Sequence, residues 1–262
     1  MSLPPTVEVW GLPLAPLRLA EAADAAIALA RVGGRGPSFL VTANTHYAML
    51  AERREDLREV NRRAAMVLAD GAPLVWASRL SGRPLPERVA GSDLIYALTE
   101  RAAAAGLPVY FLGGAPGVAA RAVQRLEARC PGLKVVGVES PPFRPLTAHE
   151  QAGQLDRIRA AAPALLILAA TMPAGELWLA EHLAATGVPF GVNLGASIDF
   201  VAGRVRRAPR WMQRSGLEWS YRLAQEPRRL GGRYLRNGQF VLARLAGSLA
   251  GRALGRAPGA PT

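Results

Sequence analysis

The sequence has little of what disulfide-bonded, zinc-binding or membrane-spanning proteins need. It contains one cysteine, Cys130, which excludes an internal disulfide and a cysteine-based zinc site. No run approaches the roughly 18 apolar residues of a membrane span. Residues 1–5 show no charged stretch followed by an apolar one, so we expect no signal peptide. These absences favour a cytosolic or peripherally bound protein.

What the chain has instead is a large apolar fraction and an uneven charge. Half of its 262 residues are hydrophobic, which is enough for a sizeable core and argues against disorder. Residues 1–200 hold 19 Lys+Arg and 18 Asp+Glu, a net charge of +1, whereas residues 201–262 hold 13 and 2, a net of +11. We therefore predict a nearly neutral globular part, 1–200, and a cationic appendage, 201–262, suited to nucleic acid, phosphorylated ligands or an anionic membrane.

Short apolar runs alternate with longer amphipathic segments after residue 38, as is typical of parallel strands joined by helices. The pattern predicts an α/β, Rossmann-like fold: a mostly parallel sheet with helices on both faces. Strands are expected at 39–42, 66–69, 108–112, 133–138, 164–169 and 190–194. Helices are expected at 47–63, 73–80, 92–105 with a serine cap, 117–129, 148–161 and 176–185, and in the appendage at 211–223, 227–235 and 240–254.

Polar residues directly after each strand are the candidate site, because ligands of such sheets bind beyond the carboxyl ends of the strands. Five strand ends supply them: Thr42 and Asn44, Asp70, Gly113 and Gly114, Thr171, and Asn193. Burial would raise the pKa of Asp70 toward the range of a general base, but the residue could equally cap the next helix. Thr42 and Asn44 suit hydrogen bonds to a sugar or nucleotide, or a local turn.

Three further features have a structural reading beside the chemical one. Gly113 and Gly114 would let backbone N–H groups approach a diphosphate, although the run is neither a Walker loop nor a dinucleotide fingerprint. His46 is interpreted as a structural hydrogen-bonding residue, in preference to the alternative that it acts as a second base. Cys130 is interpreted as an inert thiol.

Arginine supplies two candidate anion sites. A loop expected at 79–93 offers Arg83 and Arg88, with Glu87 and Asp93 as their alternative partners. The appendage has a higher density of arginine than this loop. The use of arginine in place of lysine suits bidentate contact with phosphate, although codon usage would give the same preference for arginine. They stand at positions 204, 206, 207, 210, 214, 222, 228, 229, 233 and 236. Interleaved aromatic residues fit an interfacial helix or stacking on nucleic acid: Trp211, Trp219 and Tyr221.

Several motifs resemble those of the WecG/TagA/CpsF family of bacterial glycosyltransferases and cover residues 38–236 in the family's order. They are Thr42-Ala43-Asn44, Ala69-Asp70-Gly71, Gly82-Arg83-Pro84-Leu85 with Arg88, Phe111-Leu112-Gly113-Gly114, Gly195-Ala196, Arg207-Ala208-Pro209, and Gly216-Leu217-Glu218-Trp219 continuing to Arg229. The resemblance implies an inverting, metal-independent transfer of N-acetylmannosamine or a related sugar. The implied donor is a UDP-sugar, with no cofactor, and the implied acceptor is a polyprenyl-diphosphate-linked sugar of cell-surface polymer synthesis.

The resemblance also implies roles for residues. Asp70 is the implied base, and Thr42 and Asn44 would line the sugar pocket. Further substrate contacts are expected from Arg83, Arg88, Gly113, Gly114, Asn193, Arg207, Arg214, Arg222 and Arg229. The appendage is implied to complete the site and to dock on the inner face of the cytoplasmic membrane. Nucleic acid is not an expected partner, and self-association is left open.

One position departs from the family's pattern. The family usually has Gly-x-Pro-x-Gln-Glu, whereas this chain has Thr171-Met172-Pro173-Ala174-Gly175-Glu176, so Gly175 stands at the glutamine position. A glycine has no side-chain amide to donate, so the donor sugar is undetermined. Two alternatives are kept: Gly175 motivates a non-catalytic binder of lipid-linked sugars, and the basic appendage with its tryptophans motivates a nucleic-acid-binding protein.

Overall fold

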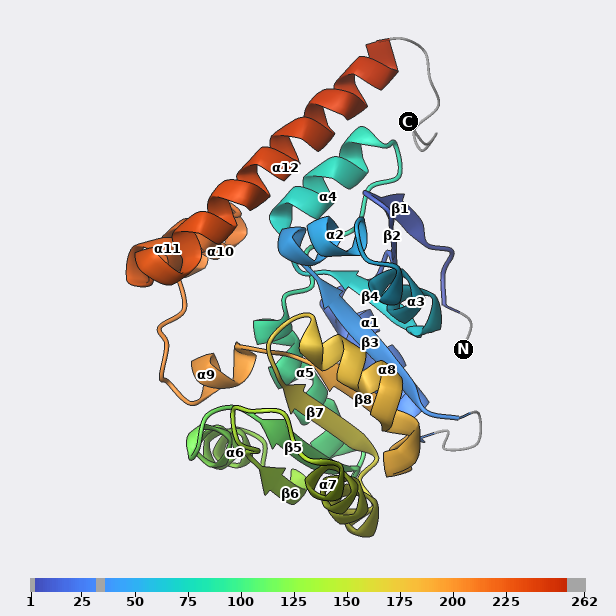
Figure 1. Cartoon of the computed structure of the whole chain (residues 1–262), viewed down its shortest axis with the longest axis vertical. Coiled ribbons are helices and arrows are strands. Elements are labelled where there is room, and N and C mark those ends of the chain that lie inside the picture. Colours follow the sequence, from blue (N-terminus) through green and yellow to red (C-terminus); the bar gives the residue numbers. More distant parts are fainter. Residues whose placement is uncertain (1–2, 32–35, 254–262) are drawn as a thin grey trace.

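A sheet of eight strands forms the centre of the molecule (Figure 1), whose computed structural model describes residues 3–31 and 36–253. The strand order is β1-β2-β4-β3-β8-β7-β5-β6, and every pair is parallel except β1 with β2. The carboxyl ends of the parallel strands therefore share one edge. The bounds are β1 Val7–Val9, β2 Leu12–Leu14, β3 Ser38–Ala43, β4 Met66–Ala69, β5 Pro108–Gly113, β6 Lys134–Glu139, β7 Leu165–Ala169 and β8 Phe190–Asn193.

Helices cover both faces of the sheet, because successive residues of each strand point to opposite sides. Leu40 of β3 lies in the core shared with α1 Leu19–Arg31, α5 Gly91–Ala104, α6 Val118–Arg129 and α9 Ser197–Val201. Val41 lies in the core of the other face, shared with α2 Thr45–Ala51, α3 Glu55–Arg63, α4 Ala72–Leu80, α7 Ala148–Ala161 and α8 Ala174–Thr186. The predicted α/β architecture is confirmed.

The first three elements, β1, β2 and α1, are absent from the sequence prediction. The two strands have three residues each, too few to show a period. Trp10 and Gly11 join them with positive φ angles of 51° and 77°, the backbone that a two-residue hairpin turn needs. The buried face of α1 is mostly alanine, which differs little in hydropathy from its surroundings.

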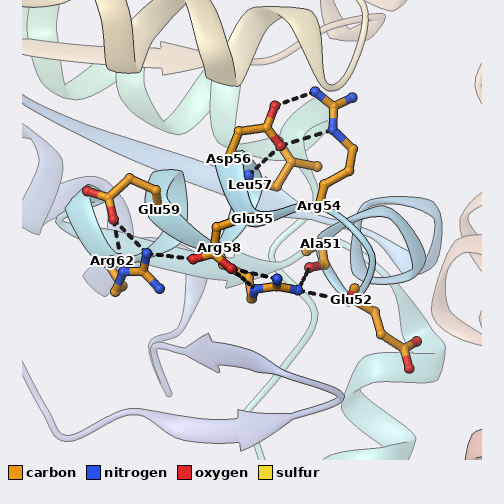
Figure 2. Close-up of polar contacts among 9 residues, drawn as sticks. All are labelled: Ala51, Glu52, Arg54, Glu55, Asp56, Leu57, Arg58, Glu59 and Arg62. Atoms are coloured by element: carbon orange, nitrogen blue, oxygen red, sulfur yellow. Dashed lines mark hydrogen bonds and ion pairs between the residues drawn. The ribbon is translucent and has the colours of Figure 1, made fainter.

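The single helix expected at 47–63 is wrong, because the structure has α2 and α3 with a break between them. Figure 2 shows what stabilises the break: the Arg58 guanidinium donates to the carbonyl oxygens of Ala51 (3.4 Å) and Glu52 (2.9 Å). These carbonyls lie at the end of α2 and lack partners within that helix. At the start of α3 the Asp56 carboxylate accepts from the Leu57 amide (2.9 Å).

The expected serine cap and the length of the expected loop are also wrong. Helix α5 begins at Gly91, and its N-cap is Ala90 without a side-chain hydrogen bond. The loop spans only 81–90, and two hydrogen bonds hold it: Leu85 N donates to Ser78 Oγ (2.9 Å), and Val89 N donates to Ala69 O (2.9 Å). The second bond holds the loop against the carboxyl end of β4, because Ala69 is the last residue of that strand.

The appendage is helical, as predicted, with α10 Arg210–Arg214, α11 Glu218–Gln225 and α12 Pro227–Ala253. The two helices expected after residue 227 are one, because α12 packs along the core despite its glycines. It lies against α2 and α4 (Figure 1). The ring of Phe240 meets Trp10 edge to face at 5.5 Å. No helix in the described part of the chain is both long and apolar enough to cross a membrane. The domain division at residue 200 stays a prediction.

Candidate functional site

Asp70 lies at the carboxyl end of β4, where the chain leaves the sheet. Its own N–H continues the strand pairing by donating to Ala43 O (2.8 Å). The carboxylate faces the start of α5, and a Cβ placed on Gly91 would lie 3.6 Å from Asp70 Oδ2. The N-cap of α4 is Gly71, with no side-chain cap, so Asp70 does not cap the helix that follows it.

The side chain of Asp70 is partly buried, and this burial is the largest cause that raises its pKa, to about 7. Arg88, a backbone hydrogen bond from Gly91, and Arg207 all lower this pKa, whereas Glu218 raises it. A carboxylate with a pKa near neutral is matched to general-base work at physiological pH.

Two arginines and two acids form an ion-pair cluster beside Asp70, made of Arg88, Asp93, Arg207 and Glu218. Arg88 donates to Glu218 Oε2 through both Nη1 and Nη2 (3.0 Å each). Arg207 donates through Nε to Glu218 Oε1 (3.3 Å) and forms a bidentate pair with Asp93, whose Nη2–Oδ2 distance is 2.8 Å. The structure thus brings together Asp70 with two of the predicted substrate arginines.

The polar residues at the carboxyl end of β3 bond to nearby protein atoms. Asn44 is the N-cap of α2, and its Oδ1 accepts from Tyr47 N (3.1 Å), which is the turn-type role considered for it. Thr42 is buried, and its hydroxyl lies 3.5 Å from the carbonyl oxygen of Asn193. Since β3 lies between β4 and β8, Thr42 occupies the strand end next to Asp70.

Asn193, at the end of β8, is buried in a network of its own. Its Nδ2 donates to Glu176 Oε1 (2.9 Å), and its Oδ1 accepts from Ala170 N (3.1 Å) and Gly195 N (3.4 Å). Burial raises the pKa of Glu176 to about 7, whereas the bond from Asn193 lowers it. A Cβ at Gly175 would lie 2.2 Å from Asn193 Nδ2, so the asparagine side chain fills the space that a side chain at 175 would take.

Gly113 and Gly114 pack closely against the end of β7. Gly113 has φ +107°, and a Cβ there would lie 2.6 Å from Ala169 O. The Gly114 N–H donates to the same oxygen (3.0 Å), so this amide already has a partner. Close packing against β7 therefore accounts for Gly113, and the positive φ of 76° accounts for Gly114. A diphosphate contact stays a prediction.

The other predicted arginines whose side chains the structure describes lie outside the ion-pair cluster. Arg83 is exposed in the loop 81–90. Arg214 ends α10, and its side chain is outside the described part. Arg222 lies over the Phe200 ring at 5.3 Å, and Arg229 pairs with Glu226 one turn away on the same surface. Among the described side chains, Arg207 is therefore the one appendage arginine in the cluster.

His46 and Cys130 lie outside the ion-pair cluster. His46 faces Arg233 of α12, and its pKa is lowered by burial and by Arg233, while its Nδ1 is buried without a hydrogen-bond partner among the described residues. Cys130 is buried, and burial raises the pKa of its thiol. Within 3–31 and 36–253, no three His, Cys, Asp or Glu side chains are grouped to hold a metal ion. Metal-independent chemistry stays a prediction.

Sequence reasoning missed Glu218 and Glu176 and misplaced two acids. Asp93 pairs with Arg207 rather than with Arg83 or Arg88, and Glu87 accepts from Leu19 N (2.6 Å). Glu218 had one sequence feature in its favour: it is one of only two acids among 13 basic residues after position 200. Glu176 also had one, because it stands at the final glutamate of the family's Gly-x-Pro-x-Gln-Glu pattern.

Comparison with known proteins bears on this geometry. The chain matches the family described as "Glycosyl transferase WecG/TagA/CpsF family" over residues 7–253. It is 32% identical over 192 residues to a protein of Bacillus spizizenii, and the match covers 73% of each chain. That relative is the N-acetylglucosaminyldiphosphoundecaprenol N-acetyl-beta-D-mannosaminyltransferase.

Proposed function

The chain belongs to the WecG/TagA/CpsF family of glycosyltransferases, and from this we propose that it moves N-acetylmannosamine or a related sugar from a UDP-sugar to a polyprenyl-diphosphate-linked acceptor. The acceptor is proposed from the similar Bacillus enzyme, whose name specifies an N-acetylglucosaminyl-diphosphoundecaprenol substrate. The observation that carries the proposal is Asp70, a carboxylate with a pKa of about 7 at a strand end beside two arginines.

In the proposed reaction Asp70 removes the proton from the acceptor hydroxyl as that oxygen attacks the anomeric carbon. The new glycosidic bond forms on the face opposite UDP, the bond to UDP breaks, and the configuration inverts. Burial raises the pKa of Asp70 to about 7, which places this carboxylate in the range of a general base at neutral pH. No covalent enzyme intermediate is needed for a single displacement.

Arginines are the proposed partners of the departing UDP, whose diphosphate gains negative charge as the bond breaks. Arg88 and Arg207 lie beside Asp70 and remain one-fifth exposed, so anions can reach them. Arg83 is exposed at the same loop and is a second source of positive charge. The arrangement supports a donor whose diphosphate faces the appendage.

Peripheral attachment to the membrane is the proposed location, because the acceptor is lipid-linked. One side of α12 presents Arg228, Leu235 and Leu242, which are spaced seven residues apart and so share a helix face. Leu235 and Leu242 are 66% and 70% exposed, and Trp211 of α10 is 63% exposed. Basic and apolar side chains on one face suit an anionic membrane surface.

A donor screen tests the proposal directly. UDP release is measured for several UDP-sugars with a synthetic polyprenyl-diphosphate-GlcNAc acceptor, for the wild type and for Asp70→Asn. We expect acceptor-dependent release with one donor class, and a rate lowered about 10²- to 10⁴-fold by Asp70→Asn. Near-normal turnover in the variant would contradict the base assignment. The absence of acceptor-dependent release with any donor would favour the non-catalytic binder.

A further inference from the structure

Glu218 links the appendage to the core, and the proposed function gives this residue no role. It opens α11, and its side chain is only 12% exposed. Both of its oxygens are used: Oε2 accepts from Arg88 of the core, and Oε1 accepts from Arg207 of the appendage. An appendage that carries 13 basic residues thus places one of its two acids between the arginines nearest Asp70.

Two guanidinium groups placed side by side and largely out of water repel each other unless acids neutralise them. Glu218 and Asp93 supply two negative charges to the two positive charges of Arg88 and Arg207. The cluster is therefore neutral overall. Burial is the main cause of the raised pKa of Asp70, and Glu218 opposes the lowering of that pKa by the two arginines.

The arginines keep donors for a ligand while they bond to the acids. A guanidinium has five N–H donors. In the bonds described above, Arg88 uses two nitrogens, each through one N–H, and Arg207 uses one N–H on each of its three nitrogens. A phosphate can therefore be bound without removing the carboxylates.

We propose that Glu218 is a positioning residue for the glycosyl transfer: from the start of α11 it holds Arg88 and Arg207 beside Asp70. This inference rests on the proposed function. The opposite role would be a carboxylate that occupies the place of the diphosphate and must leave when the donor binds. The two roles predict opposite effects of removing the charge on donor affinity.

The test compares Glu218→Gln with the wild type in kcat, KM for the UDP-sugar and pH profile. We expect kcat/KM to fall between about tenfold and a hundredfold, because the arginines lose their alignment. The acid limb of the pH profile should move to lower pH, because Glu218 raises the pKa of Asp70. The control is Glu59→Gln, which removes a carboxylate–arginine pair on the exposed face of α3 (Figure 2) and should change neither value.

A second variant separates charge from geometry. Glu218→Asp keeps the charge on a shorter side chain, so the pH profile should stay near that of the wild type while kcat/KM stays reduced. A tighter donor KM in Glu218→Gln would overturn the proposal in favour of displacement by the diphosphate. Unchanged kcat/KM and an unchanged pH profile in a folded Glu218→Gln protein would overturn it as well.

A readout without turnover keeps this inference distinct from the proposed function. The carboxyl ¹³C resonance of Asp70, assigned by its loss in Asp70→Asn, reports the pKa of that group directly. We expect its midpoint at lower pH in Glu218→Gln and unchanged in Glu59→Gln. If the wild type transfers no sugar, the proposed function fails. Coupling of Glu218 to Asp70 is then still decided by this titration, and an unmoved midpoint overturns it.

Discussion

Asn193 and Gly175 form a pair in which each residue constrains the other. The asparagine amide bonds to Glu176 and to two backbone amides, and it lies where a side chain at 175 would begin. The glycine at the position where the family has glutamine is thus explained by packing. The donor screen measures its effect on the choice of sugar.

Gly175→Ala should therefore lower the free energy of unfolding by about 1–3 kcal/mol, because the new methyl group overlaps a buried, hydrogen-bonded amide. Alanine is the better helix former, so propensity alone predicts the opposite sign. Gly238→Ala in α12 is the matched control, because no atom lies within 4 Å of its Cβ position. It should be stabilising by about 0.5–1 kcal/mol. Urea unfolding of both variants provides the measurement.

Glu176 should make the folded protein less stable as the pH rises. The pKa of its carboxyl is about 7 in the fold against 4.5 for the unperturbed group, so the folded state alone holds this proton between those values. Its contribution to the free energy of unfolding therefore falls with rising pH across that window, by on the order of 3 kcal/mol in total.

Glu176→Gln removes this titration and keeps an oxygen to accept from Asn193. The variant should match the wild type near pH 5 and exceed it in unfolding free energy at pH 8. Urea unfolding at both pH values measures the difference. Equal stability of the two proteins at pH 8 would mean that Glu176 is ionised in the fold at no cost.

At the scale of elements, the strand–helix alternation predicted six of the eight strands and missed β1 and β2. Five of the strands are apolar runs buried on both faces: β3, β4, β5, β7 and β8. Such continuous apolar runs are the pattern from which a buried parallel strand is most readily predicted. The α2–α3 break depends on one arginine that reaches back seven residues, and the ion-pair cluster joins residues 130 positions apart. Such contacts depend on the completed fold and have no local pattern.

The exposed face of α12 is the element on which membrane binding is predicted to depend. Leu235→Glu combined with Leu242→Glu should lower partitioning to anionic vesicles at least about tenfold, since two apolar anchors are lost and two negative charges are added. The melting temperature should change little, because both side chains are already exposed. Phe143→Glu is the control, since Phe143 is 81% exposed but follows β6. Unchanged partitioning of the double variant in vesicle flotation would contradict this role of α12.

At the scale of the whole molecule, the net charge of +12 is divided between a core of +1 and an appendage of +11. Exposed charges on the appendage act through solvent, where salt screens them. The ion-pair cluster is partly buried and is screened less. Binding and chemistry should therefore respond differently to salt.

Raising the NaCl concentration from 0.1 to 1 M shortens the Debye length from about 10 Å to about 3 Å. We expect vesicle binding to be largely lost across this range, while turnover of a short-chain, water-soluble acceptor stays within about twofold. Flotation and UDP release, measured on one preparation, check the two halves. Loss of both together would show that long-range charge also serves the transfer step.

The ion-pair cluster also bears on whether the two parts of the chain can be exchanged between relatives. Each part contributes one base and one acid, Arg88 and Asp93 from the core and Arg207 and Glu218 from the appendage, and the pairs cross between them. A chimaera that kept this core but took an appendage lacking either partner would leave a buried charge unmatched. Modular swapping therefore requires these four positions to be inherited as a set.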